Sequence, residues 1–389
     1  MSEFSLLASR STVTLASIFL SPLTHIDNAC FESRVCHLEN YLRPQMTTSI
    51  ACICRSVALP IQLDSVTDQS NLQLCHCNSC RMVTGQLFSS YYLLQHEPPN
   101  LNGLQKYQQS KHVSRFFCRT CGAHVFARLQ PGGQFLLASG LLAAKNVPSV
   151  RAVEHWKSSD TGDGGLSALL PGTESTVTGC RLSPSTSIES RESTNPVKYT
   201  STSQHLHARC LCGGVEFYIT KPDASSLQAS SPWPDLLVPY HTGSGANPNN
   251  IKWWLRDGDT KYIAGTCVCN SCRLSSGFPI QTWAFVPKSN IFNADGSPLV
   301  FNAGTMQQHR SSPGVYREFC SCCGATAFWH CDERPMLIDV SAGLLQATGA
   351  RAEDWLEWAT DRISFAEMAV QHDLIHILEE GLKIYSKRN

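Results

Sequence analysis

Fourteen of the nineteen cysteines in this 389-residue chain fall into short C-x-C, C-x-x-C and C-x-C-x-x-C groups. Cysteines two or three residues apart rarely pair with each other in structural disulfides, but their sulfurs converge easily on one metal ion. The spacing therefore favours metal thiolates over the disulfides of a small secreted protein. The five remaining cysteines are expected to be ordinary free thiols, and they are Cys30, Cys36, Cys180, Cys322 and Cys331.

The cysteine groups occur twice in the same order, which indicates an internal repeat. Each copy contains C-x-C, then C-x-C-x-x-C-R, then F-C-x-x-C-G. A Gly-Leu-Leu stretch also recurs beyond the last group, at Gly140 and at Gly343. The first copy contributes Cys52, Cys54, Cys75, Cys77, Cys80, Cys118 and Cys121, and the second contributes Cys210, Cys212, Cys267, Cys269, Cys272, Cys320 and Cys323.

Seven cysteines in each copy divide most simply into four and three. Structural zinc takes four ligands, so the C-x-C pair and the distant C-x-x-C pair would form one closed cluster. The C-x-C-x-x-C group forms an open triad, with three thiolates and a free fourth position of the kind found in catalytic zinc sites. We therefore expect two zinc ions per domain and four per chain.

The charge of the open triad indicates its chemistry. A zinc ion with three thiolates carries a net negative charge, so it is a weaker Lewis acid than zinc bound by three neutral histidines. It suits a further sulfur ligand, and zinc lowers the pKa of a bound thiol. The triads thus predict a thiol substrate, and the catalytic candidates are Cys75, Cys77, Cys80, Cys267, Cys269 and Cys272.

An alternative is that both sets are structural and that the protein is a non-catalytic zinc scaffold. His76 and His124 are near the cysteines, but each is expected to support the site or lie at the surface. Val268 stands in the place of His76 in the second copy. Arg81 and Arg273, which follow the triads, could bind a carboxylate, although a solvated structural role is favoured for both.

Composition excludes several classes of partner. The 31 basic side chains balance the 31 acidic ones. A neutral chain is a poor candidate for binding nucleic acid or an acidic membrane surface. No apolar stretch reaches the length of about 18 residues expected of a membrane span. We therefore expect a soluble, cytoplasmic protein that binds neither nucleic acid nor membrane.

Each copy is expected to be mainly β, because short β-like runs are bounded by Gly, Pro or Asn. These runs are 57–63, 88–94, 135–138, 215–220, 282–286 and 336–340. At the C-terminus, Ser364 and Glu367 fit a capping box, and apolar residues from Met368 to Leu382 follow at helical spacing. We expect this C-terminal helix to pack on the second domain.

The repeat also predicts the domain boundaries. A Ser/Thr-rich stretch separates the copies, and the second copy has an insertion whose tryptophans are expected to pack locally, or alternatively to line a cleft. Residues 1–45, which precede Met46, are interpreted as a disordered or non-native extension. The expected divisions are 1–45 extension, 46–160 first zinc domain, 161–204 linker, and 205–389 second zinc domain with an insertion at 221–262. Within the linker, residues 160–165 could still close the first domain as an ordered loop.

The ordered set of cysteine motifs resembles the glutathione-dependent formaldehyde-activating enzyme family, also known through centromere protein V. This resemblance covers both copies from about residue 48 onward and implies an all-β tent fold. The implied reaction joins glutathione to formaldehyde, giving S-hydroxymethylglutathione, and is classed as a carbon–sulfur lyase. A tailoring enzyme acting on another thiol conjugate is an alternative.

The resemblance also implies a role for each cysteine. The implied structural zinc ligands are Cys52, Cys54, Cys118 and Cys121, with Cys210, Cys212, Cys320 and Cys323 in the second copy; the implied catalytic zinc ligands are the two open triads. The family commonly has Gly after the first C-x-C, where this chain has Arg55 in one copy and Gly213 in the other. We expect this difference to change a turn and leave the metal site intact.

Overall fold

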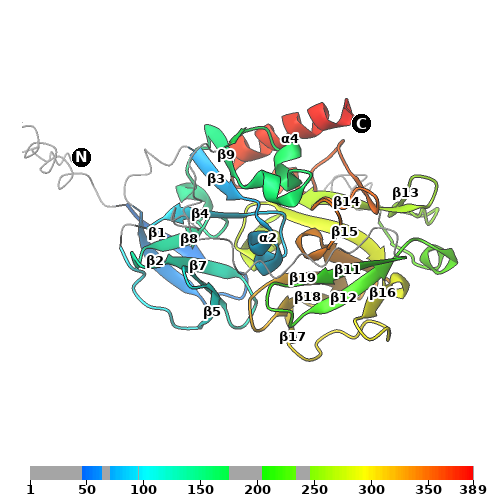
Figure 1. The fold of residues 1–389 in the computed structure, drawn as a ribbon, viewed down its shortest axis with the longest axis horizontal. Helices are drawn as coiled ribbons and strands as arrows, with labels where there is room; N and C mark the ends of the chain where they lie inside the picture. Colours follow the sequence, from blue (N-terminus) through cyan, green and yellow to red (C-terminus); the bar gives the residue numbers. More distant parts are fainter. Residues whose placement is uncertain (1–45, 64–70, 95, 175–203, 234–245, 389) are drawn as a thin grey trace, which may run out of the picture. The chain divides into compact units, whose positions relative to one another are not determined.

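The computed structural model describes residues 46–63, 71–94, 96–174, 204–233 and 246–388. The predicted N-terminal extension, most of the linker, Cys30, Cys36 and Cys180 lie outside these residues. From residue 45 onward the chain forms one compact unit. The described part is mostly β, as predicted, and contains three α-helices (Figure 1).

The first copy is built around an eight-stranded sheet with strand order β10-β9-β3-β4-β8-β7-β6-β5 and a separate β1–β2 hairpin. Its helix α2 spans Asn78–Thr84, between β3 and β4. The strands are β1 (Met46–Ala51), β2 (Ala58–Leu63), β3 (Asn71–Cys75), β4 (Ser89–Leu93), β5 (Leu104–Ser110), β6 (Val113–Cys118), β7 (His124–Leu129), β8 (Phe135–Ala138), β9 (Ala152–Trp156) and β10 (Thr173–Glu174).

The second copy repeats this plan. Its larger sheet has the order β13-β14-β15-β20-β19-β18-β17, with β21 added beside β14, and β11, β12 and β16 form a small sheet. Helix α3 spans Asn270–Ser276. The strands are β11 (His205–Arg209), β12 (Glu216–Thr220), β13 (Leu255–Arg256), β14 (Lys261–Cys267), β15 (Gln281–Pro287), β16 (Ile291–Asn293), β17 (Met306–Ser312), β18 (Val315–Cys320), β19 (Thr326–Cys331), β20 (Leu337–Ser341) and β21 (Leu356–Trp358).

All six predicted β-like runs coincide with strands, namely β2, β4, β8, β12, β15 and β20. The hairpins β5–β6 and β17–β18 were not predicted. Strand β5 alternates between half-buried and exposed side chains after its first residue, so it carries too few buried apolar residues to stand out in the sequence.

The predicted capping box at Ser364 is wrong. Ser364 instead extends the large sheet, where its backbone N–H donates to Thr266 and its carbonyl accepts from Val268. Helix α4 (His372–Ser386) begins later, after Gln371, with no side-chain cap. Ser364 is therefore held by sheet hydrogen bonds, and the apolar spacing predicted the helix better than the capping motif did.

Helix α4 contacts both copies. The Tyr385 hydroxyl donates to Glu353 of the second copy. In the first copy, Asp373 accepts hydrogen bonds from the Ser149 hydroxyl (2.6 Å) and the Val150 N–H (3.1 Å). The helix therefore packs across the two copies instead of on the second domain alone, and Figure 1 shows it in red beside β9 and β3.

Residues 158–174, which include the start of the expected linker at residue 161, are folded against the first copy. Leu166, Leu169 and Leu170 are buried, and β10 pairs in parallel with β9. A Cβ atom on Gly381 of α4 would lie 2.2 Å from the Leu169 carbonyl oxygen, so the helix backbone approaches this segment closely. The segment fills the space between the first copy and α4.

The insertion of the second copy packs locally, as expected for its tryptophans. Trp253 and Trp254 are fully buried, and their indole N–H groups donate to the Trp233 and Ser226 carbonyls at 3.0 and 3.3 Å. Trp253 also packs edge-on against Phe285 of the sheet. These tryptophans therefore belong to the core of the second copy.

Two buried arginines join the copies by reciprocal hydrogen bonds. Arg81 of α2 donates to the Gly343 and Leu345 carbonyls at 2.9 and 2.7 Å. Arg273 of α3 donates to the equivalent Gly140 and Leu142 carbonyls of the first copy. The expected solvated role is therefore wrong, because both arginines are buried and anchor one copy to the recurrent Gly-Leu-Leu turn of the other.

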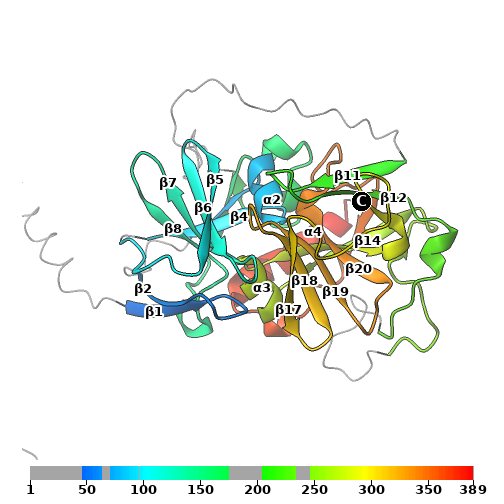
Figure 2. The same cartoon turned by 90° about the horizontal axis from the view of Figure 1, so that it is seen from below.

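The C-terminal ends of α2 and α3 also contact the opposite copy closely. Gly85 ends α2 with φ of +79°, and a Cβ atom there would lie 2.1 Å from the Thr326 carbonyl oxygen of the second copy. Gly277 ends α3 in the same conformation, and its Cβ would lie 2.1 Å from the His124 carbonyl oxygen. Glycine is needed at both positions because of its conformation and the close approach. The copies thus pack as an internal pseudo-dimer with the self-complementary contacts of a two-fold interface (Figure 2).

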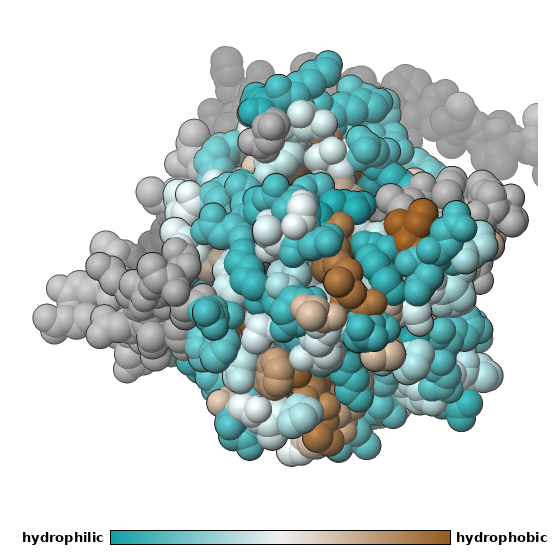
Figure 3. Space-filling view, turned by 90° about the vertical axis from the view of Figure 1, so that its right-hand side faces the viewer, coloured by the Kyte–Doolittle hydropathy of each residue, from teal (hydrophilic) through white to brown (hydrophobic). Residues whose placement is uncertain are grey.

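In the described residues, no helix is both long enough and apolar enough to span a membrane. Figure 3 shows one face on which small apolar patches are separated by hydrophilic side chains. No large continuous apolar area covers that face.

Gly85→Ala should destabilise the protein by about 2–4 kcal/mol, from the left-handed conformation and the overpacking against Thr326 together. Gly132→Ala is the control, because nothing lies within 4 Å of a Cβ there, and it should change stability by less than about 0.5 kcal/mol. Denaturant unfolding measures both. Equal stability of the two variants would contradict the close packing of the copies.

Candidate metal centres

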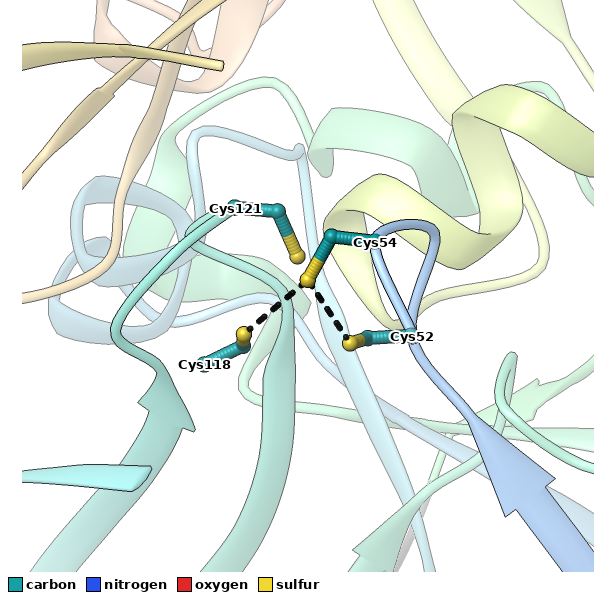
Figure 4. Close-up of side chains that lie close together, drawn as sticks. All are labelled: Cys52, Cys54, Cys118 and Cys121. Carbon is teal, nitrogen blue, oxygen red and sulfur yellow. Dashed lines mark hydrogen bonds between the residues drawn. The ribbon is translucent and has the colours of Figure 1, made fainter. Parts of the chain in front are cut away.

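Each copy brings four cysteine sulfurs together in a closed cluster. In the first copy the sulfurs of Cys52, Cys54, Cys118 and Cys121 all lie within 4.8 Å of one another, and Figure 4 shows them pointing to a common centre. Neighbouring sulfurs are 3.4 Å (Cys52–Cys54) and 3.5 Å (Cys54–Cys118) apart. The second copy repeats the cluster with Cys210, Cys212, Cys320 and Cys323.

Two tight turns deliver these sulfurs. The turn after β1 carries the C-x-C pair, and the turn between β6 and β7 carries the C-x-x-C pair. Arg55 follows the first pair with φ of 61°, close to the 76° of Gly213 in the second copy. The expectation that Arg55 changes the turn is therefore wrong, because the arginine adopts the left-handed conformation that glycine has in the other copy.

The crowding of the sulfurs drives their pKa values apart. Hydrogen bonds with Cys118 and Cys121 lower the pKa of Cys54, whereas hydrogen bonding to Cys118 raises the pKa of Cys121. The second cluster behaves in the same way, because hydrogen bonds among its sulfurs lower the pKa of Cys320 and raise the pKa of Cys323. Such a group keeps some sulfurs protonated unless a cation takes the place of the protons, and four thiolates in this arrangement suit zinc.

The open triads form around the start of each short helix. Cys75 ends β3, Cys77 caps α2, and Cys80 lies in its first turn; the Cys77 sulfur accepts a hydrogen bond from the Cys80 N–H at 3.4 Å. Cys267, Cys269 and Cys272 repeat this around α3, with 3.3 Å for the same bond. The three sulfurs of each triad lie within 4.8 Å of one another, so each triad could hold a metal ion.

The surroundings of the two triads differ. Ala127, Leu136 and Trp156 form a small apolar cluster with Cys75 and Cys80, separate from the main core. Ala127 and Leu136 are cross-strand partners, and the corresponding pair in the second copy is Trp329 and Asp339. Asp339 in turn forms a buried ion pair with Arg334 at 2.6 Å. At this cross-strand pair the first copy thus has two aliphatic residues, where the second has an aromatic and a charged residue.

Two buried arginines that the sequence analysis missed contact the triads. Arg115 of β6 donates to the Cys80 sulfur at 3.2 Å, and Arg317 of β18 lies 3.7–3.8 Å from the Cys272 sulfur. Burial opposes the charge of Arg115, but Tyr91 and Cys80 raise its pKa above the ordinary value. A recurrent R-x-F-C at 115–118 and 317–320 was the available signal.

His76 and His124, the two histidines near the cysteine motifs, are buried and hydrogen-bonded, and neither belongs to a cysteine cluster of the described residues. His155 donates to the Leu170 carbonyl at 2.8 Å, so its other ring nitrogen accepts from His76 at 2.9 Å. His124 donates to the Val83 carbonyl at 2.9 Å. Burial lowers the pKa of His76 and of His124 to about 3, so both are neutral supports of the structure.

Each closed cluster also touches the triad helix of the other copy. The N–H of Ile53, between Cys52 and Cys54, donates to the Leu274 carbonyl of α3 at 3.0 Å. The equivalent N–H of Leu211 donates to the Met82 carbonyl of α2 at 3.1 Å. A closed cluster in one copy therefore supports the open triad of the other.

A sequence profile for glutathione-dependent formaldehyde-activating enzymes matches residues 47–159 and 252–360, more than half of the chain. The chain belongs to this family. The two matched regions correspond to the two copies of the repeat, and the second begins beyond Cys210 and Cys212, which the insertion separates from the rest of their copy. The family match is consistent with the four cysteine clusters, each of which could hold a metal ion.

One curated relative is an uncharacterized lyase of Schizosaccharomyces pombe, which is 28% identical over 76 residues. The match covers 19% of this chain and 53% of the relative, so the chain spans about half the length of that protein. No solved structure matches the chain.

If the second closed cluster binds metal, Cys320→Ser should remove that metal and destabilise the protein by several kcal/mol, because metal binding at such a site is coupled to folding. The neighbouring Cys322→Ser is the matched control, since Cys322 is exposed and lies outside the clusters, and it should keep both metal content and stability. Metal analysis and thermal unfolding measure the pair. Equal metal loss from both variants would contradict the cluster assignment.

Proposed function

We propose that the protein is a zinc-dependent carbon–sulfur lyase that joins glutathione, or another thiol, to formaldehyde or a small carbonyl compound. The observation that carries this proposal is the pair of three-cysteine triads, each short of one ligand for tetrahedral zinc. Zinc in a triad supplies an open coordination position for sulfur and lowers the pKa of the thiol that occupies it. Family membership and the lyase relative support this class of reaction.

The proposed reaction forms one carbon–sulfur bond and moves one proton. The thiol loses its proton, its sulfur forms a bond to the carbonyl carbon, and the carbonyl oxygen receives a proton to become the hydroxyl of the adduct. The reverse reaction breaks the same carbon–sulfur bond. Cys75, Cys77 and Cys80 come from one strand-to-helix turn and would together hold the ion to which the substrate sulfur binds. Thiolate chemistry of this kind fits a reducing compartment such as the cytoplasm.

The closed clusters serve the fold in this proposal. Each joins the turn after the first strand of its copy to the turn between β6 and β7, or between β18 and β19. Each also borders the triad helix of the other copy through Ile53 or Leu211. We propose one zinc in each closed cluster and one in each triad, with the different residues beside the triads allowing the copies to differ in the second substrate.

The reaction is tested with purified protein, glutathione and formaldehyde, with adduct formation followed by exchange NMR. We expect exchange faster than the spontaneous reaction. No acceleration would exclude formaldehyde as the carbonyl substrate, and the same assay with other small aldehydes would then test the wider class.

Cys77→Ser and Cys269→Ser together separate an enzyme from a zinc scaffold. Serine caps helices well, so α2 and α3 should form and the protein should stay folded. Activity should fall by about 100-fold or more, since loss of a ligand costs at least as much as loss of its supporting residues. Unfolding of the double variant would favour the scaffold, and the two single variants show which copy is active.

A further inference from the structure

We propose that Arg115 and Arg317 set the charge of the open triads so that each accepts its thiol as the anion. This inference rests on the proposed function and deepens it by assigning residues that control sulfur binding. Both arginines act through a cysteine of the triad, Cys80 or Cys272, and are therefore positioning residues and not catalytic ones.

The position of Arg115 supports this role. Its side chain is fully buried, and each of its three nitrogens has a protein partner: Gln109 at 2.7 Å, the Tyr91 hydroxyl, and the Cys80 sulfur at 3.2 Å. The guanidinium carbon also lies 5.0 Å from the centre of the Tyr91 ring. These three bonds use three of the five N–H groups, and the side chain is fully buried against Tyr91 and Cys80, so its charge acts on the triad itself.

The second copy reaches the same arrangement with different neighbours. Arg317 is buried, lies 3.7 and 3.8 Å from the Cys272 sulfur through its two terminal nitrogens, and donates to the Ser275 hydroxyl at 3.1 Å. Trp283 occupies the position of Tyr91. An arginine kept at the third cysteine despite these changed neighbours indicates that its charge at the sulfur matters in both copies.

The arginine changes the net charge of a metal-loaded triad. A divalent ion with three thiolates has one net negative charge, and binding of a fourth thiolate would raise this to two net negative charges. A buried guanidinium in contact with one sulfur cancels one of these charges, so the triad is neutral before the thiol binds and singly negative afterwards. In a buried site, where charges interact strongly, this difference favours binding of the thiolate over the neutral thiol.

The test uses protein loaded with cobalt, whose absorption spectrum changes when a thiolate joins the metal. Wild type and the double variant Arg115→Met/Arg317→Met are titrated with glutathione. The variant should bind glutathione about 10- to 100-fold more weakly, as expected for loss of a charge-assisted hydrogen bond. Arg115→Lys/Arg317→Lys keeps the charge and should stay close to wild type.

S-methylglutathione separates this role from a structural one, because it keeps every carboxylate of glutathione but has no thiol. Its affinity should be the same for wild type and variant, whereas a damaged site or a lost carboxylate contact would weaken both ligands. Arg128→Met is the control for general charge, since Arg128 contacts Glu97 and Gly133 instead of a cysteine. If the methionine variants do not fold, glutamine variants, which keep a donor without the charge, carry the same comparison.

The outcomes also separate this inference from the proposed reaction. Weaker glutathione binding by the neutral variants supports the inference even if formaldehyde is not a substrate. Equal glutathione affinity of wild type and the neutral variants would overturn it and leave the lyase proposal standing. Failure of wild-type cobalt protein to bind glutathione would overturn both.

Discussion

Cysteine sulfurs held within 4.8 Å of one another repel strongly once they are ionised, and this constraint dominates the structure. Two thiolates at that separation repel by about 3–4 kcal/mol even at an effective dielectric constant of 20. The clusters can therefore be fully ionised only around a cation. The turns after β1 and β6 and the start of α2 are all placed where such a cation would draw their sulfurs together, and the second copy repeats each of them.

The two copies depend on each other through the elements that carry these sulfurs. Arg81 and Arg273 are buried, and in the described part of the chain the backbone carbonyls that they bond lie in the opposite copy. Burial lowers the pKa of each to about 10, so both remain charged at neutral pH and need those partners. The tandem duplication is thus more than two domains on one chain, because each triad helix is anchored by the other copy.

The sequence predicted the features that follow from local spacing. The repeated motifs indicated groups of four and three cysteines, and the structure brings the same sulfurs together, while their binding of metal stays a prediction. The mainly β fold followed from short apolar runs. The partners of Arg81 could not be predicted, since they lie more than 260 residues away and have no local signature. Ser364 was wrongly predicted to cap a helix because serine occurs both at helix starts and beside strands. Its hydrogen bonds to the sheet, which the sequence does not reveal, decide between the two. Arg115 was overlooked although its motif recurs, because arginine is not a metal ligand and its distance of three residues from a cysteine does not indicate a metal site.

The central claim is that the two open triads bind metal in addition to the two closed clusters. Native mass spectrometry of the intact protein, purified without chelators, counts the bound ions directly. The account predicts four zinc ions per chain. Two zinc ions per chain, each lost when its own closed cluster is mutated, would leave the triads without metal and contradict it.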